Sequence, residues 1–386
     1  MRLAIVTPRY GPDVLGGAET LARGLAHAAT RRGWDVDVWT TCARSHYNWR
    51  NVHPAGVERH QGVLVHRFPV SRKAPHRHAE LDLCLAERGE LSPEDQYAWL
   101  ESGAHSPQLY AHVARYASQR DLVLALPYAA PLIHYAAWAM PRQVVLWPCL
   151  HDEPYAFMEP VRLLLESVRG VMFLTPEEHD LALRRLGVRP RRTGIVGGGV
   201  TPWPDSADGG TPAGDLLLYV GRLEGGKNVG LLYESMRRYA ERDSGVRLMV
   251  LGRGPSTPPR HPAIEYRGFV AEEEKRRIYR RALALCQPSL NESFSITVME
   301  SWLAGRPVLV HGACPVTRGH VERSRGGLWF SSCDEFVGAV EWLRSHPALA
   351  TRMGQNGQRY VMANYTWSAV LARFEQLLVD WGMGDA

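Results

Sequence analysis

The sequence lacks the signatures of several common protein classes. Its six cysteines are scattered and include no Cys-x-x-Cys pair, a pattern that excludes a disulfide framework or a zinc finger and predicts reduced thiols in a reducing compartment. Basic residues form no dense block and the net charge is only +5, so we expect no nucleic-acid partner. Neither a complete G-x-G-x-x-G nor a G-x4-G-K-[ST] motif is present, which argues against a dinucleotide-dependent dehydrogenase and a P-loop enzyme.

Long apolar runs are also missing. The chain begins with only four consecutive apolar side chains before Thr7, fewer than a signal peptide needs. Residues 122–141 contain no Asp, Glu, Lys or Arg, but Pro127 and Pro131 would break a membrane-spanning helix there. This stretch is therefore predicted to be a buried strand followed by a core helix. We expect a cytoplasmic protein, and peripheral contact with the inner membrane surface stays open.

Composition and pattern predict two α/β domains. Charged residues make up 22% and apolar residues 45% of the 386 residues, which is typical of a globular protein of about two domains. Apolar segments without alternation, such as 3–7 and 216–220, are followed by a loop and a helical segment, as in parallel sheets covered by helices. Residues 43–118 fit less well and are predicted to include an insertion. We predict two Rossmann-like, doubly wound domains over 1–195 and 215–365, joined by a Gly- and Pro-rich linker over 196–214.

Two carboxylates bracket the start of a predicted helix in the second domain. Glu292 precedes the helix that begins at Ile296, and Glu300 lies in about its second turn. Free backbone N–H groups at a helix N-terminus favour an anion such as a phosphate, and carboxylates beside it can accept hydrogen bonds from sugar hydroxyls. The spacing suits a nucleotide sugar, although two solvated glutamates would produce the same pattern.

Two loops with paired glycines follow predicted strands and could contact phosphate. In the loop 221–228, Arg222 and Lys227 could clamp a diphosphate, Arg as a planar fork and Lys as a point charge. Gly16 and Gly17 open the first helix, where the backbone can approach a ligand. Each loop is also compatible with an ordinary strand-to-helix turn.

A polar loop at 151–153 follows the predicted strand 144–146, at the edge where open α/β sheets bind ligands. His151 could hydrogen-bond a sugar hydroxyl there, or the loop could simply be polar. Asp35 and Asp37 spell a D-x-D that could in principle hold a metal. They alternate with valines on a predicted strand, so we predict a polar strand edge and no metal site.

In this order across two Rossmann-like halves, these segments resemble the retaining glycosyltransferases of family 4, which have the GT-B fold. The resemblance covers nearly the whole chain. Its most specific motifs are E-x7-E at 292–300 and G-R-L-x3-K at 221–227, and segments such as RGFV at 267–270 support it. The family's fold implies two domains that face each other across a cleft, with a C-terminal helix in 366–386 that packs back on the first domain.

The resemblance implies a catalytic role for four residues, Glu292, Arg222, Lys227 and His151. The two cations would bind the donor diphosphate, and Glu292 would hold hydroxyls of the donor sugar. His151 would lie near the transferred sugar, on the acceptor side.

A donor-binding surface is implied as well. Glu300 would hold the ribose, and the loop with Gly16 and Gly17 would approach the diphosphate from the other domain. Ser295 stands where many members have glycine, which leaves the identity of the sugar open. The remaining implied contacts are Gly252, Phe269 and Val270 near the base, and the backbone N–H groups of Phe294, Ser295 and Ile296 near the sugar and phosphate.

The expected reaction moves a hexose from a UDP- or GDP-linked sugar to an acceptor hydroxyl, with retention at the anomeric carbon and without a metal or other cofactor. The acceptor, which could be a glycan, a lipid-linked sugar or a small molecule, stays open, as does the oligomeric state. A nucleotide-sugar epimerase of the same build and a non-catalytic nucleotide-sugar-binding protein are the alternatives.

Overall fold

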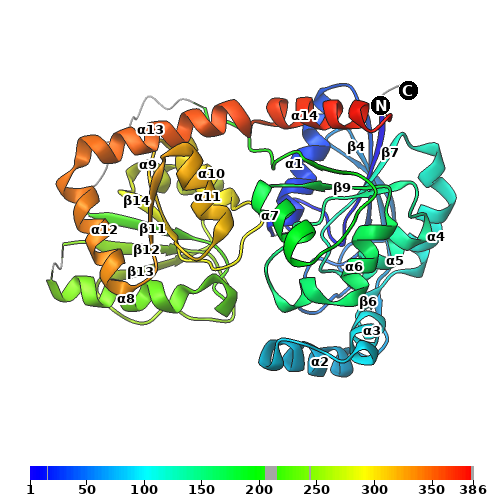
Figure 1. Ribbon diagram of the computed structural model, residues 1–386, viewed down its shortest axis with the longest axis horizontal. Coiled ribbons are helices and arrows are strands. Elements are labelled where there is room, and N and C mark those ends of the chain that lie inside the picture. The colour runs from blue at the N-terminus through cyan, green and yellow to red at the C-terminus, as the bar shows by residue number, and fades with distance from the viewer. Residues whose placement is uncertain (15, 205–214, 243–244, 384–386) are drawn as a thin grey trace. The chain divides into compact units, whose positions relative to one another are not determined.

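The computed structural model describes residues 1–14, 16–204, 215–242 and 245–383. The chain forms two compact units, one of Met1–Gly199 with Trp367–Ala386 and the other of Val200–Thr366. Each unit contains one large sheet with helices packed on it (Figure 1). Residues 205–214 of the predicted linker lie outside the described residues.

The first unit is built on an eight-stranded sheet with the order β10-β9-β8-β7-β1-β2-β4-β3. All neighbouring strands are parallel except β3 and β4. The inner strands β7 and β8 are buried along their whole length, which explains their unalternating apolar sequences. The strands are β1 (Arg2–Val6), β2 (Asp35–Thr41), β3 (Gly56–His60), β4 (Val63–Phe68), β7 (Leu122–Ala125), β8 (Val144–Leu146), β9 (Gly170–Phe173) and β10 (Thr193–Ile195).

The helices of this unit start at recognisable signals. Five of them, α2, α3, α4, α5 and α7, begin with proline, whose fixed φ and missing N–H suit the first helical position. Ser92 and Thr175 cap α3 and α7 with their side chains. The helices are α1 (Gly17–Arg31), α2 (Pro75–Arg88), α3 (Pro93–Ser102), α4 (Pro107–Tyr116), α5 (Pro131–Ala139), α6 (Glu159–Ser167), α7 (Pro176–Asp180) and α14 (Trp367–Asp380).

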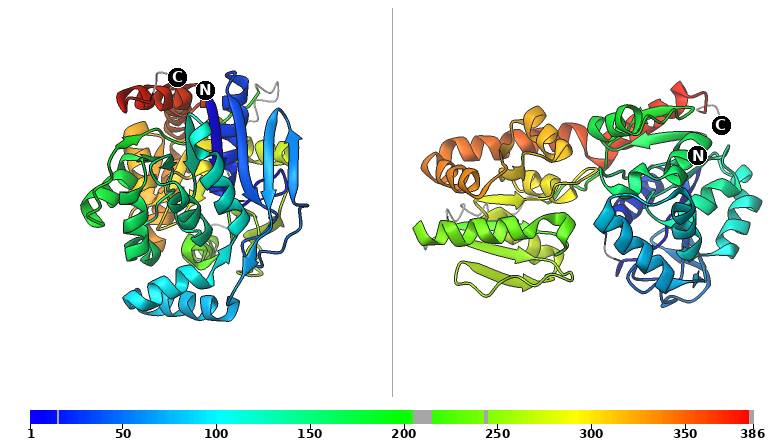
Figure 2. Two further views of the ribbon diagram at one scale, coloured as in Figure 1. Left: turned by 90° about the vertical axis from the view of Figure 1, so that its right-hand side faces the viewer. Right: turned by 60° about the horizontal axis from the view of Figure 1, so that its bottom comes forward.

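Residues 43–118, predicted to include an insertion, divide into two parts. Strands β3 and β4 extend the main sheet, and Figure 2 shows this blue hairpin at one edge of it. Helices α2 and α3 pack against each other away from the sheet (Figure 1). The short strands β5 (Ser71–Arg72) and β6 (Ala104–His105) pair at the base of these helices.

The structure corrects the prediction made for the D-x-D segment, Asp35 and Asp37. Strand β2 lies between β1 and β4 rather than at an edge, and Asp37 is only 2% exposed. Its carboxylate forms an ion pair with Arg120, which also lies 3.5 Å from Asp35. The prediction of a polar edge was therefore wrong for Asp37, because the pattern of one strand does not show which strands flank it.

The second unit has a six-stranded sheet in which all neighbours are parallel, with the order β13-β12-β11-β14-β15-β16. Its strands are β11 (Leu216–Val220), β12 (Arg247–Leu251), β13 (Ile264–Gly268), β14 (Ala284–Gln287), β15 (Val308–His311) and β16 (Gly327–Phe330). Its helices are α8 (Val229–Arg242), α9 (Glu272–Arg281), α10 (Ile296–Leu303), α11 (Pro315–Ser324), α12 (Cys333–Ser345) and α13 (Pro347–Asn364).

Each sheet has a buried apolar core packed against its helices. In the part of the chain that the structure describes, no helix combines the length and the apolar character needed to cross a bilayer.

Helix α14 lies along α1 in the first unit (Figure 1). Trp367, at the start of α14, fills a space that glycines leave open. A Cβ added at Gly24 or at Gly199 would lie 2.2 Å from the Trp367 ring. At the other end of α1, Arg32 forms a two-pronged ion pair with Glu375. The C-terminal helix is thus held by shape as well as by charge.

We expect Trp367→Ala to lower the free energy of unfolding by about 3–5 kcal/mol, because it empties a cavity between α1, α14 and Gly199. Val379→Ala is the matched control on the same helix, since Val379 is 57% exposed. Chemical denaturation measures both. Equal stability of the two variants would contradict the packing role of Trp367.

Candidate active site

The predicted residues of the second unit gather at the carboxyl ends of two neighbouring strands. Strands β11 and β14 are parallel neighbours, so the loops that follow them lie at one edge of the sheet. The Lys227 Nζ atom, after β11, lies 2.7 Å from Glu292 Oε1, after β14. Their side chains are 15% and 10% exposed. The sequence motifs G-R-L-x3-K and E-x7-E therefore meet through this ion pair.

The loop before α10 is held in one conformation. Ser295, the residue before the helix, has a φ of 66°, in the left-handed region that favours glycine. Gln287, at the end of β14, donates hydrogen bonds to the hydroxyl groups of Ser295 and Thr297 at 3.2 and 3.0 Å. The buried Phe294 ring packs edge-on against His320 and Tyr365. Helix α10 thus begins at Ile296, directly after a turn whose backbone is held by these contacts.

Glu300 is bound on both of its oxygens by side chains from α9. Lys275 Nζ lies 2.8 Å from Oε1, and the Tyr279 hydroxyl donates to Oε2 at 3.0 Å. Burial alone would lower the pKa of Lys275, but the charges and hydrogen bonds of Glu300 and Glu272 raise it overall. Burial and the Glu300 charge raise the pKa of Tyr279 well above its usual value.

Lys275 and Tyr279 were not predicted as site residues. They are four positions apart in the helix 272–281, so they share one helical face. A second signal is composition, because only three of the 45 basic residues are lysines, namely Lys73, Lys227 and Lys275. Two of these three bind the two glutamates of the E-x7-E segment.

Arg222 lies on the same loop as Lys227 but pairs with Glu224, whereas Lys227 pairs with Glu292. Its guanidinium is about half exposed and lies 3.1 Å from Glu224. The structure therefore brings Lys227 together with Glu292 and leaves Arg222 paired within its own loop.

Close backbone contacts shape the neighbouring loops. Gly252 follows β12 with a φ of 134°, and a Cβ there would lie 1.8 Å from the Gly221 carbonyl oxygen. The N–H of Gly252 donates to the carbonyl of Gly268 at 2.8 Å. After β13, Phe269 is 55% exposed and Val270 is half-buried. The three loops after β11, β12 and β13 thus lie side by side, with Gly252 in the middle.

In the first unit, Gly16 and Gly17 stand at the start of α1. Gly16 has a φ of 151°, which side chains rarely adopt, and a Cβ there would lie 2.0 Å from a Glu19 carboxylate oxygen, so glycine is favoured at this position. Glu19 forms a buried ion pair with Arg9. The carboxylate of Glu19 therefore lies over the first turn of the helix, a feature that the glycine pattern did not predict.

His151 lies in the loop that follows β8, at the carboxyl end of the first sheet. Its Nδ1 atom lies 3.5 Å from Glu153 Oε1, and its side chain is 26% exposed. The Tyr128 hydroxyl donates to the same oxygen of Glu153 at 2.7 Å. Glu153 thus links a buried tyrosine to the imidazole of His151.

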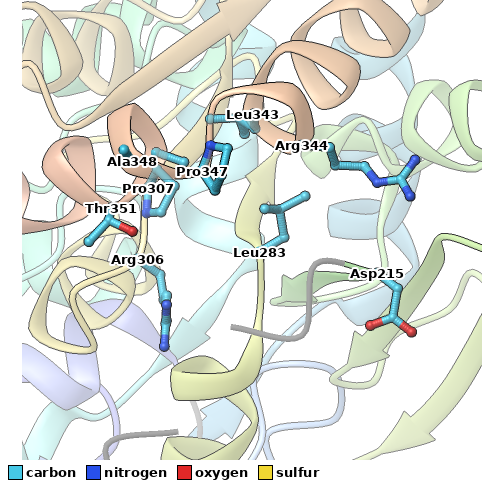
Figure 3. Close-up of a pocket in the computed structure, with 10 residues that line it drawn as sticks. Asp215, Leu283, Arg306, Pro307, Leu343, Arg344, Pro347, Ala348 and Thr351 are labelled. Carbon is cyan, nitrogen blue, oxygen red and sulfur yellow. The ribbon is translucent and has the colours of Figure 1, made fainter. Parts of the chain in front are cut away.

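A pocket of about 650 Å³ lies at the opposite ends of the strands of the second unit (Figure 3). Asp215, Leu283 and Pro307, which line it, precede β11, β14 and β15. Arg306 and Arg344 point in different directions in Figure 3, so they do not converge on one ligand. None of the predicted site residues lines this pocket.

Among residues 1–14, 16–204, 215–242 and 245–383, no group of three or more His, Cys, Asp and Glu side chains is arranged to hold a metal ion.

Comparisons with known proteins bear on this arrangement. Residues 214–346 match the family model of "Glycosyl transferases group 1". The chain is 20% identical to an uncharacterised glycosyltransferase of Methanocaldococcus jannaschii, over 96% of each chain. Sucrose-phosphate synthase from Thermosynechococcus elongatus aligns over 100% of both chains with a TM-score of 0.74 and 18% identity. HepE of Anabaena, solved in complex with UDP-glucose, aligns over 98% of this chain and 100% of its own with a TM-score of 0.70 and 14% identity.

The fold is GT-B. The family match and the relative support the coarser prediction of a glycosyltransferase. The matched residues include Arg222, Lys227, Glu292 and Glu300, and therefore the region in which the two lysine–glutamate pairs form.

His320, which packs against Phe294 in the loop before α10, is a buried histidine whose pKa is lowered in the folded protein. It is fully buried on α11, against Phe294 and within 3.1 Å of the Tyr360 hydroxyl. Burial, together with the charge of Arg323, lowers the pKa of His320 from 6.5 to about 3. The folded protein therefore keeps His320 neutral at a pH at which the unfolded chain would protonate it.

We expect this group's contribution to stability to be complete above pH 6.5 and to be lost as the pH falls toward 3. Relative to His320→Gln, wild type should lose on the order of 3 kcal/mol of unfolding free energy between about pH 6.5 and pH 4. Urea denaturation at several pH values measures the difference. A constant difference across this range would mean that the pKa of His320 is the same in the folded and the unfolded protein, and would contradict the prediction.

Proposed function

We propose that the protein is a retaining hexosyltransferase of family 4 that takes its sugar from a nucleoside diphosphate. The observation that carries the proposal is the 2.7 Å contact between Lys227 and Glu292 in front of α10. It joins a cation suited to a diphosphate with a carboxylate suited to sugar hydroxyls, beside a helix N-terminus that favours anions. The Anabaena neighbour was solved with UDP-glucose, which supports a nucleotide sugar as the donor.

The ion pair suggests how donor binding proceeds. A diphosphate at the start of α10 would compete with Glu292 for Lys227. The Glu292 carboxylate would then be released to accept hydrogen bonds from the sugar. Arg222, which is about half exposed on its loop, would turn from Glu224 to the diphosphate. Glu300, oriented by Lys275 and Tyr279, would accept hydrogen bonds from the ribose.

The proposed chemical step is attack from the face that the diphosphate leaves. The bond between the anomeric carbon and the diphosphate oxygen breaks, and the bond to the acceptor oxygen forms on the same side. The acceptor proton passes to an oxygen of the leaving diphosphate. Negative charge grows on that diphosphate, where Lys227, Arg222 and the α10 N-terminus would stabilise it.

We also propose that the reaction needs no metal ion. The positive charge of Lys227 and Arg222 and of the helix N-terminus would serve the leaving group. The D-x-D segment does not offer two available carboxylates, because Asp37 is buried in its ion pair with Arg120.

Lys227→Ala should lower kcat by about a hundredfold or more, because one charge that stabilises the leaving group is lost. Lys73→Ala is the control, since Lys73 is the exposed lysine outside the two glutamate pairs. Circular dichroism checks folding, and release of nucleoside diphosphate measures turnover. Turnover like wild type in Lys227→Ala would overturn the assignment.

The function itself is tested with a panel of UDP- and GDP-hexoses and an acceptor pool, with and without EDTA. We expect release of nucleoside diphosphate and a glycoside with the anomeric configuration of the donor, at the same rate in EDTA. A changed sugar still attached to its nucleotide would indicate an epimerase. Donor binding by thermal shift with no turnover would indicate a binding protein, and loss of activity in EDTA would contradict metal independence.

A further inference from the structure

We propose that Glu178 is a positioning residue for His151, acting through the backbone of the loop that carries it. The proposal rests on the proposed function, because it gives His151 a place in the reaction. Glu178 belongs to none of the sequence motifs described above.

Glu178 lies in the first turn of α7 and is 1% exposed. One carboxylate oxygen accepts a hydrogen bond from the N–H of Leu150, and the other accepts one from Leu174. The backbone of Thr175 also contributes a hydrogen bond. Burial raises the pKa of Glu178 to about 8, while these three backbone groups oppose the rise. The carboxyl group is thus held mainly by peptide N–H groups from two loops, one after β8 and one after β9.

The loop before His151 is fixed at three successive points. The N–H of Trp147 donates to Ala125 at 2.8 Å, and the Pro148 carbonyl accepts from Tyr128 at 2.9 Å. Leu150 is the third point, through Glu178. Between the second and third points Cys149 has a φ of 54°, a conformation that is unfavourable for a residue with a Cβ.

These contacts place Glu178 one residue before the exposed part of the loop, where the backbone N–H of His151 in turn hydrogen-bonds the Tyr128 hydroxyl. Leu150 is buried, whereas the next residue, His151, is 26% exposed at its side chain. The direction in which the His151 Cα–Cβ bond leaves the backbone is therefore set by two neighbouring contacts, the carboxyl group of Glu178 at Leu150 and the hydroxyl of Tyr128 at His151 itself. The ring itself is then oriented by Glu153.

A carboxyl group suits this position better than an amide does. Leu150 and Leu174 present N–H donors to two different oxygens. Glutamine keeps the shape, but one of its two terminal groups is a donor and would face another donor. Glu178→Gln therefore removes one anchor without emptying the core.

The test is a double-mutant cycle between Glu178→Gln and His151→Gln, measured as release of UDP from UDP-glucose. We expect Glu178→Gln to lower kcat by about tenfold to a hundredfold, because His151 is misplaced. The KM for UDP-glucose should stay within about twofold of wild type. The double variant should be no slower than His151→Gln, since both changes remove the same contribution. Effects on kcat that multiply would show that Glu178 acts independently of His151 and would overturn the proposal.

Glu159→Gln is the matched control, because Glu159 is an exposed glutamate in the first turn of α6. It should leave kcat unchanged. Thermal unfolding checks that each variant is folded. If Glu178→Gln does not fold, Glu178→Asp takes its place in the cycle, because it keeps both carboxylate oxygens on a shorter side chain. Unchanged kcat in a folded Glu178→Gln or Glu178→Asp variant would also overturn the proposal.

A second measurement does not depend on activity. In protein labelled with ¹⁵N-histidine, the His151 resonance is assigned by its absence in His151→Gln. We expect it to shift or broaden in Glu178→Gln and to stay in place in Glu159→Gln. If wild type releases no UDP from any donor while this shift is present, the proposed function fails but the link from Glu178 to His151 stands. An unmoved resonance would overturn that link.

Discussion

Two lysine–glutamate pairs organise the site in the second unit. Lys227 binds Glu292 and Lys275 binds Glu300, each across less than 3 Å and with little exposure to water. Attraction between opposite charges is strong where solvent is largely excluded, but such a pair also has to offset the cost of its own desolvation. Stability alone therefore does not account for both pairs. In the proposed function, both pairs hold charged side chains in place for a nucleotide sugar.

How much of this arrangement could be predicted depended on whether the signal was local. Glu292, Glu300 and Lys227 follow short apolar strands, so their position at the carboxyl edge of a sheet could be inferred from the chain alone. The contact of Lys275 with Glu300 could not be inferred in this way. Helix α9 connects β13 and β14 in the chain, and whether its side chains reach Glu300 depends on tertiary packing. For Arg222 the motif predicted the position of the residue in the loop. It did not predict the partner that the side chain contacts, Glu224.

The same distinction applies to the fold. The strand over 216–220 was predicted and is observed at Leu216–Val220, because its apolar run is short and uninterrupted. Strand β13 was not predicted, since its sequence, IEYRG, carries charges and is partly exposed at the sheet edge. Asp37 was misjudged for the opposite reason, because a charged residue on an interior strand is buried by a partner, Arg120, 83 positions away. Edge and interior are properties of the whole sheet and not of one strand.

The two units use a similar device to hold residues that have a role in the proposed function. Ser295 and Cys149 both adopt left-handed backbone conformations, with φ of 66° and 54°, although neither is glycine. Such a conformation is unfavourable by about 1–2 kcal/mol and persists only where neighbours hold it. Gln287 and Phe294 support the first turn, and Tyr128 and Glu178 support the second. Ile296, directly after Ser295, and His151, two residues after Cys149, therefore have fixed backbone positions. In each case one residue that fixes the backbone comes from another segment, Gln287 for the first turn and Glu178 for the second, so a motif can indicate a candidate group while the residues that hold it must be found in the structure.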